Sequence, residues 1–290
     1  MLPCSHSEIY ATHNLKKISQ LKAKPTLDYV RAIILGVIEG ITEFLPISST
    51  GHLLIAEQWL GQRSDTFNIV IQSGAMLAVT IIYWPRLMEL ALGWHSRGTR
   101  SYFGKLALAF ILTASLGFAA KRAGLSLPES VVPVAWALIV GGVWIMIAER
   151  LAVRYRPNNH VSWIAAVLVG LAQVVAGVFP GTSRSAATIF AAMAAGTTDR
   201  RAATDFAFLV GIPTMYAASA FELLAAAKNT GVQEDWAALG LAFATALVTA
   251  FIAVKWLLGF IKTHAFTGFA IYRLVLGALL LGCVAMGWVR

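Results

Sequence analysis

The stretch from Glu39 to His52 reads E-G-I-T-E-F-L-P-I-S-S-T-G-H, and it interrupts a long apolar segment with a proline and a run of hydroxyl side chains. A second apolar segment is broken in the same way, where P-G-T-S-R-S runs from Pro180 to Ser185. Pro180 lies 134 positions after Pro46, and the same offset aligns Gly36, Glu39 and Ser49 with Gly170, Gln173 and Ser183. Ionisable side chains inside lipid-compatible segments are costly, so they indicate a functional site.

The composition is typical of a polytopic membrane protein, because 58% of the residues are apolar and only 13% are charged. The net charge of +9 does not indicate nucleic-acid binding, since the basic residues fall in short loops between apolar runs. Membrane topology and anionic headgroups explain that distribution better. Cys4 and Cys283 are far apart and form no metal-binding pattern, so we expect neither a disulfide framework nor a zinc site.

Six apolar stretches are long enough to cross a hydrocarbon core, each with about 18 to 23 residues. They are Phe67–Trp84, Phe103–Ala120, Val131–Ala148, Phe206–Leu224, Trp236–Leu258 and Phe266–Trp288. Two further apolar regions, Tyr29–Leu60 and Ser162–Gly196, are broken by proline and have flanks too short for two spans each. We interpret both as re-entrant helical hairpins, whose irregular backbone must be enclosed by protein or by a water-filled cavity.

The predicted fold is therefore an all-α polytopic membrane protein with about six transmembrane helices and two re-entrant helical hairpins. Each half contains one hairpin and three spans, over about residues 28–150 and 161–290, so the second half is inverted relative to the first. Inverted repeats of this kind place their sites where the broken helices meet. We expect residues 1–27 to form a polar, basic tail and residues 28–290 to form a single integral membrane domain.

Basic residues are more numerous in one set of loops, those after Trp84, after Glu149, near Arg200 and around Lys255. The positive-inside rule predicts that these loops are cytoplasmic, although the basic tail argues for the opposite orientation. In this arrangement the first hairpin enters from outside and the second from the cytoplasm.

Glu39 and Glu43 are four residues apart, so they share one helix face with Gly36 and Gly40. Two carboxylates this close in an apolar setting need a divalent cation or a cationic side chain nearby. The glycines on the same face permit another backbone to approach closely. A solvated pair on an exposed face is the alternative, but the neighbouring side chains are apolar.

The hydroxyls after Pro46 are expected to open a new helix, with Ser48 or Ser49 as its N-cap. Helix N-termini attract anions, and phosphate in particular. A serine can attack phosphorus if a base takes its proton, and a histidine can serve as base or nucleophile. Simple capping by the serines and simple packing by His52 are the structural alternatives.

Arg184 adds a permanent cation to the second broken segment, and its planar guanidinium matches the oxygens of a phosphate. Snorkelling to the surface is the alternative, but Arg184 lies among apolar neighbours. Gln72, on the first span, either lines the same pocket or forms a hydrogen bond between helices. Carboxylates, hydroxyls, a histidine, an arginine and two helix N-termini together indicate phosphoryl transfer.

At these residues the chain resembles the undecaprenyl-diphosphate phosphatase family, which is associated with bacitracin resistance. The family signature E-G-x-T-E-F-x-P-x-S-S-T-G-H is unbroken from Glu39 to His52, and Pro180–Ser185 with Thr188 meets a second signature, P-G-x-S-R-S-G-A-T. The resemblance extends over about residues 28–290. Three positions depart from the usual pattern without removing a catalytic residue type: Ala186, Asp205 and Ala207.

The resemblance implies a hydrolase of the bacterial inner membrane that converts undecaprenyl diphosphate to undecaprenyl phosphate, recycling the lipid carrier of peptidoglycan synthesis. It implies a site open to the extracytoplasmic side and a divalent cation, Mg²⁺ or Ca²⁺, held by Glu39 and Glu43, which are also candidate bases. Ser49 or His52 is the implied nucleophile or its activator, and Arg184 clamps the phosphates. The implied substrate-binding residues are Ser48, Thr50, Gly181, Thr182, Ser183 and Ser185. A homodimer is left open.

Two rival functions fit part of the pattern. An inverted-repeat transporter, or a flippase for a polyprenyl phosphate, would have the same architecture. A lipid phosphatase of the phosphatidic-acid type is faintly echoed by Thr50-Gly51-His52, but the next histidine after Arg184 is His264, which is too distant for that chemistry. A purely structural membrane protein would not need buried glutamate, histidine and arginine.

Overall fold

The computed structural model describes residues 27–125, 130–226 and 235–288, and every regular element in these ranges is a helix. The predicted tail, including Cys4, lies outside the described residues apart from Leu27. A first helix covers residues 27–42. The helices that follow are α2 (Ser49–Leu60), α3 (Asp65–Leu92), α4 (Arg97–Arg122), α5 (Val131–Val153), α6 (Trp163–Val178), α7 (Arg184–Ala194), α8 (Arg200–Ala226), α9 (Trp236–Phe260) and α10 (Thr267–Ala285).

Six of the described helices are long and apolar enough to cross a membrane, and these are α3, α4, α5, α8, α9 and α10. They coincide with the six predicted spans, so that prediction is confirmed. Some helices are longer than the predicted spans. For example, α3 extends beyond Phe67–Trp84 at both ends, because turns outside the apolar core continue the helix. Large hydrophobic side chains such as Trp84, Val140 and Ile252 are exposed on their outer faces, as lipid contact requires.

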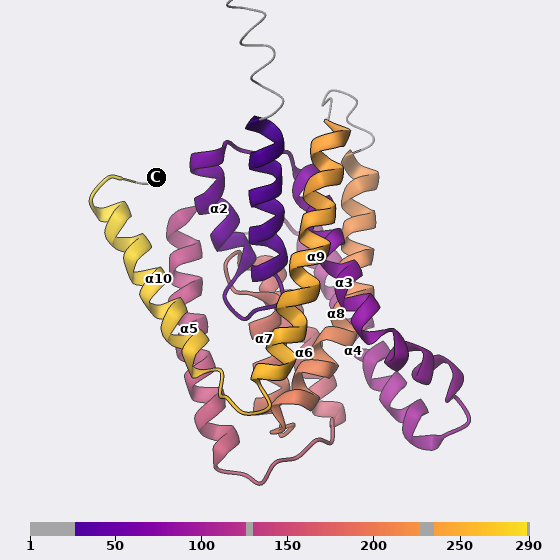
Figure 1. Cartoon of the computed structure of the whole chain (residues 1–290). Coiled ribbons are helices and arrows are strands. Elements are labelled where there is room, and N and C mark those ends of the chain that lie inside the picture. Colours follow the sequence, from indigo (N-terminus) through magenta and orange to yellow (C-terminus); the bar gives the residue numbers. More distant parts are fainter. Residues whose placement is uncertain (1–26, 126–129, 227–234, 289–290) are drawn as a thin grey trace, which may run out of the picture.

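The two proline-broken regions are pairs of short helices that turn back inside the molecule. Residues 27–42 pair with α2, and α6 pairs with α7. With 16 residues, α6 is about 24 Å long, less than the hydrocarbon core of a bilayer. Figure 1 shows the first pair running down from the upper end of the molecule and the second pair rising from the lower end. The re-entrance of these pairs into a bilayer stays a prediction.

Small residues let the first helix pack against α9. A Cβ atom at Gly40 would overlap the hydroxyl of Thr249 and approach the backbone of Ala246, so only glycine fits this contact. Gly36 approaches the backbone of Ala242 in the same way, one turn earlier. The predicted close approach of a second backbone is therefore confirmed, and it fixes the carboxylate-bearing helix to the second half of the chain.

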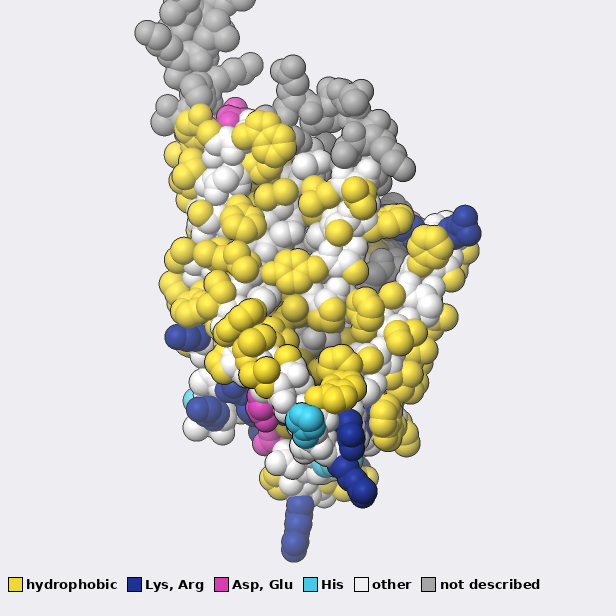
Figure 2. All heavy atoms as spheres, turned by 90° about the vertical axis from the view of Figure 1, so that its right-hand side faces the viewer, with side chains coloured by type: hydrophobic (Ala, Val, Ile, Leu, Met, Phe, Trp, Pro, Cys, Tyr) yellow, Lys and Arg dark blue, Asp and Glu magenta, His cyan; other side chains and the backbone are white. Residues whose placement is uncertain are grey.

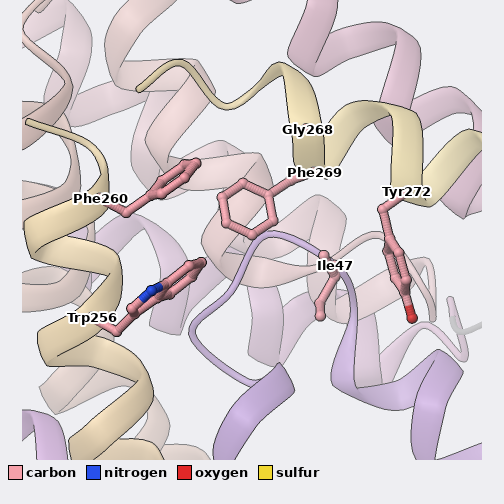
Figure 3. Close-up of a pocket in the computed structure, with 6 residues that line it drawn as sticks. All are labelled: Ile47, Trp256, Phe260, Gly268, Phe269 and Tyr272. Carbon is pink, nitrogen blue, oxygen red and sulfur yellow. The ribbon is translucent and has the colours of Figure 1, made fainter. Parts of the chain in front are cut away.

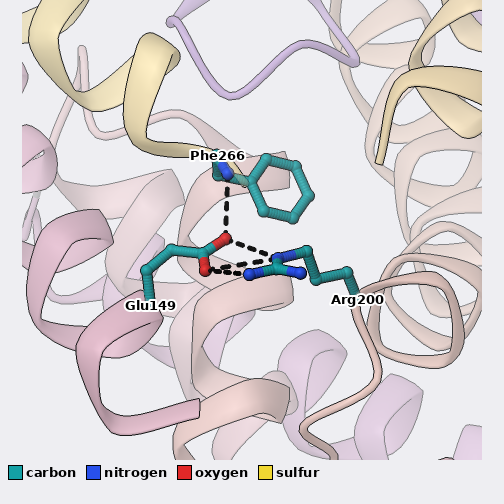
Figure 4. Close-up of polar contacts among 3 residues, drawn as sticks. All are labelled: Glu149, Arg200 and Phe266. Carbon is teal, nitrogen blue, oxygen red and sulfur yellow. Dashed lines mark hydrogen bonds and ion pairs between the residues drawn. The ribbon is translucent and has the colours of Figure 1, made fainter. Parts of the chain in front are cut away.

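An ion pair fastens three elements at the lower end of the molecule. Arg200, at the start of α8, donates to both carboxylate oxygens of Glu149 on α5, with Nη2 2.6 Å from Oε2. The other donor to Glu149 is the backbone N–H of Phe266 at 2.9 Å, just before α10 (Figure 4). The carboxylate is nearly buried, so this network is structural.

The outer surface has the layered polarity of a membrane protein. Figure 2 shows a face covered mostly by hydrophobic side chains, with charged and histidine side chains gathered toward its lower end. The same end holds the beginnings of α4 and α8 and the end of α5, where Arg97, Arg200 and Arg150 lie. Because successive helices run in alternating directions, the loops that were predicted to be basic lie at this one end of the molecule (Figure 1).

Candidate active site at the junction of two helical hairpins

The two broken segments meet inside the molecule. The Ser185 hydroxyl, in the first turn of α7, donates a 3.1 Å hydrogen bond to the backbone carbonyl of Leu45 in the first hairpin. Ser185 is buried, and its hydroxyl also lies 3.0 Å from that of Ser183. The expected meeting of the hairpins is confirmed, and Ser185, a predicted substrate-binding residue, bonds the two loops together.

Arg273 on α10 joins the same two loops from one side. Its guanidinium donates to the carbonyl of Pro46 at 3.4 Å, of Gly181 at 3.3 Å and of Thr182 at 3.1 Å. Further hydrogen bonds reach two carbonyls of α5, at Ala137 (2.9 Å) and Leu138 (3.3 Å). The side chain is fully buried, and none of these partners is a carboxylate. Arg273 therefore brings to the junction a positive charge that is not paired with a carboxylate of any described residue.

Space for this guanidinium comes from a glycine on the neighbouring helix. A Cβ atom at Gly141 on α5 would overlap Nη2 of Arg273. Gly181 has a similar role in the second loop, where its φ of 87° is left-handed and a Cβ atom would lie 2.9 Å from Cα of Val134. The conformation of the loops therefore depends on Gly141 and Gly181, two positions at which a larger residue does not fit.

Ser48 and Ser183 are the N-caps of α2 and α7. Each hydroxyl accepts a 3.3 Å hydrogen bond from the backbone N–H three residues later, and each residue has a positive φ, 75° and 66°. Such a conformation is strained for serine, so the tertiary contacts of the loops must hold it. The sequence alignment of Ser49 with Ser183 is wrong by one position, because the loop that contains Gly181 has one more residue than its counterpart.

Ser49, in the first turn of α2, faces the carboxylate helix. Its hydroxyl donates a 2.5 Å hydrogen bond to Oε2 of Glu43. Oε1 of the same carboxylate lies 3.5 Å from the side-chain amide nitrogen of Gln72 on α3. Ser49 and Glu43 have the geometry of a nucleophile with its general base. This hydrogen bond links α3 to the first hairpin, which is one of the two roles predicted for Gln72; its lining of a pocket stays a prediction.

Glu39 lies one turn before Glu43 and is almost completely buried. One carboxylate oxygen, Oε2, has no hydrogen-bond partner among the described residues. The positive charge of Arg184, at the start of α7 in the other hairpin, acts on it. A buried, unsatisfied oxygen beside a second carboxylate is suited to a cation or to a proton-bearing ligand.

Arg184 is partly exposed, and its guanidinium forms no hydrogen bond or ion pair with any described residue. The neighbouring N–H groups at the start of α7 add partial positive charge. Thr50 occupies the equivalent first turn of α2. A cation left free in this way, at the N-terminus of a helix, is available to an anion such as phosphate.

The ring nitrogens of His52 form their hydrogen bonds with residues other than Ser49. Nδ1 lies 2.6 Å from the carbonyl of Ser48, so this nitrogen carries the proton and donates it. Nε2 lies 2.6 Å from the hydroxyl of Tyr272, which donates in turn, and the two rings stack with an interplanar angle of 5°. The structure thus pairs Ser49 with Glu43 and leaves His52 to orient the N-cap of α2.

No group of three or more histidine, cysteine, aspartate or glutamate side chains that could hold a metal occurs in the described ranges. Glu39 and Glu43 form a pair only. Mg²⁺ commonly binds one or two carboxylates together with the phosphates of a substrate and water, so the pair fits a cation that binds with its substrate.

The fold and the site define the class of this protein as a polytopic helical membrane protein whose polar centre is built where two helical hairpins meet. The chain belongs to the bacitracin resistance protein BacA family, whose family model matches residues 32–279.

Curated relatives cover nearly the whole described domain. A protein of Rhizobium johnstonii named undecaprenyl-diphosphatase is 64% identical over 262 residues, which is 90% of this chain and 99% of the relative. A Rhizobium etli protein of the same name is 62% identical over 264 residues, with 91% and 100% covered. One from Xanthomonas axonopodis pv. citri is 57% identical over 255 residues, with 88% and 96% covered.

Proposed function

We propose that this protein hydrolyses undecaprenyl diphosphate to undecaprenyl phosphate and inorganic phosphate, recycling the lipid carrier of cell-wall synthesis and conferring bacitracin resistance. The observation that carries the proposal is the 2.5 Å hydrogen bond from Ser49 to Glu43, in a site where the charge of Arg184 also acts on Glu39. The names of the three relatives support the same substrate. The apolar helices suit a substrate whose chain stays in the bilayer.

The proposed reaction has two steps. Ser49 Oγ attacks the terminal phosphorus, its proton moves to Glu43, and the bond from phosphorus to the bridging oxygen breaks to release the polyprenyl phosphate. Glu43 passes this proton to the departing polyprenyl phosphate and is a carboxylate again. It then takes a proton from a water molecule that attacks the phosphoserine and returns it to Ser49 Oγ as the bond from phosphorus to Oγ breaks, which releases inorganic phosphate and restores Ser49. Arg184 and the N–H groups of the two helix starts stabilise the charge on the transferred phosphoryl group.

A divalent cation, Mg²⁺ or Ca²⁺, is part of the proposal. Glu39 and Glu43 would hold it, since Glu39 has a buried oxygen without a partner. The cation would neutralise charge on the diphosphate when the substrate is bound.

The predicted location is the bacterial inner membrane, with the basic end cytoplasmic and the first hairpin entering from the extracytoplasmic side. A homodimer also stays a prediction, and mass measurement in detergent would test it.

The test is phosphate release from undecaprenyl diphosphate by protein purified in detergent. We expect wild type to release phosphate, EDTA to suppress the release, and Arg184→Ala and Glu43→Ala to lose at least about 100-fold in kcat/KM. Arg100→Ala, on an exposed turn of α4, is the matched control and should keep full activity. Full activity in both site variants would mean that the chemistry occurs elsewhere. Folded wild type without activity would favour the transporter or flippase.

A further inference from the structure

An apolar groove lies directly against the proposed active site. It has a volume of about 240 Å³ and is lined by Ile47, Trp256, Phe260, Gly268, Phe269 and Tyr272 (Figure 3). The lining residues come from the first hairpin loop, the lower end of α9 and the beginning of α10. None of them is charged.

Two of the lining residues are shared with the polar centre. Ile47 stands between Pro46, whose carbonyl Arg273 holds, and Ser48, the N-cap of α2. Tyr272 directs its ring along the groove and its hydroxyl to Nε2 of His52 at 2.6 Å. The apolar groove is therefore adjacent to the polar centre, and Ile47 and Tyr272 connect the two.

The apolar compartment is walled by flat aromatic surfaces. The rings of Trp256 and Phe260 stack with centroids 5.1 Å apart, and Phe269 meets both of them edge-on. Trp256 is 52% exposed and Tyr272 is 44% exposed, so the groove opens on the outer surface of the helix bundle. On that surface the surroundings are the hydrocarbon chains of lipids.

We infer that this groove binds the first isoprene units of the substrate, those nearest the diphosphate. A branched, unsaturated hydrocarbon chain matches an uncharged aromatic wall, and the chain must leave the polar centre through an apolar opening. The groove then makes recognition depend on the isoprenoid chain as well as on the phosphates. This inference rests on the proposed hydrolysis of a polyprenyl diphosphate.

Gly268 offers a direct way to fill the groove. A Cβ atom there meets nothing within 4 Å, so the backbone tolerates a side chain at this position, and Gly268→Leu adds one to the lining of the groove. Gly282→Leu, later on the same helix and also open, is the matched control. The measurement is kcat/KM for farnesyl diphosphate relative to isopentenyl diphosphate, which has one isoprene unit.

We expect wild type and Gly282→Leu to prefer the farnesyl substrate, and Gly268→Leu to lower that preference about tenfold. Trp256→Ala, which removes an exposed wall, should lower it as well and serves if Gly268→Leu does not fold. An unchanged preference in both groove variants, or an equal loss on both substrates, would overturn the inference while the hydrolysis stands. If wild type hydrolyses neither substrate nor undecaprenyl diphosphate, the proposed function fails first. Ordinary membrane lipid would then be the occupant of the groove.

Discussion

Ser48 and Ser49 are adjacent and chemically identical, yet the structure gives them different tasks. The Ser48 hydroxyl accepts a backbone N–H and caps α2, so it is committed to the loop. The Ser49 hydroxyl donates to Glu43, so its proton already lies on the path to a base. The difference arises because Ser48 has a left-handed backbone and Ser49 has the backbone of a helix.

This assignment predicts losses of kcat of very different size at the two serines. Ser49→Ala should lower kcat at least about 1,000-fold, because it removes the proposed nucleophile. Ser48→Gly should lower kcat less than about tenfold, because glycine accepts the positive φ and replaces a cap at little cost. Phosphate release from farnesyl diphosphate measures both. Activity of Ser49→Ala close to that of wild type would contradict the assignment, and His52 would become the candidate nucleophile.

At the scale of elements, the site depends on α5 and α10, which hold the loops of the two hairpins in place. In the proposed mechanism Arg273 is a positioning residue, since its guanidinium contacts the loop carbonyls and the reacting atoms belong to Ser49 and Glu43. Gly141 is necessary for that contact although it lies outside the site. The same logic applies to Gly40, which sets the distance between the carboxylate helix and α9.

Gly141→Ala should therefore impair catalysis from a distance. The new methyl group displaces the Arg273 guanidinium, and we expect kcat for farnesyl diphosphate to fall about tenfold or more while the helix itself gains propensity. Gly117→Ala on α4, where a Cβ atom meets nothing, is the control and should keep its activity. Equal activities in the two variants would show that Arg273 does not position the loops.

At the scale of the whole molecule, the halves are fastened together at points away from the site. The network of Glu149, Arg200 and the backbone of Phe266 connects α5, α8 and the segment before α10 (Figure 4). It holds the lower ends of helices that carry Arg273 and the groove residues. Its loss should therefore affect stability before it affects chemistry.

Glu149→Gln tests this role. Removing one partner of a nearly buried pair leaves Arg200 uncompensated, and we expect a loss of about 3 kcal/mol of stability and a lower melting temperature in detergent. Glu89→Gln breaks an exposed pair with Arg86 and should cost less than about 1 kcal/mol. Thermal melting followed by tryptophan fluorescence compares the two. Equal melting temperatures would mean that the buried pair contributes nothing specific.

The sequence alone determined the membrane-embedded parts of this protein, because hydropathy is a local property. Six spans follow from runs of apolar residues, and the two breaks follow from Pro46 and Pro180. The residue types of the candidate site were also evident, since glutamate, arginine and histidine are rare in apolar segments.

Only the tertiary structure decided which of these residues act on one another. The partners Tyr272 and His52 are 220 positions apart, and Arg273 is 227 positions from Pro46. The turn between the first helix and α2 brings Ser49, and not His52, to Glu43. The backbone at Gly181 accounts for the one-residue difference in length between the two loops. Such contacts depend on packing between distant helices, and a linear pattern does not determine which individual side chains meet there.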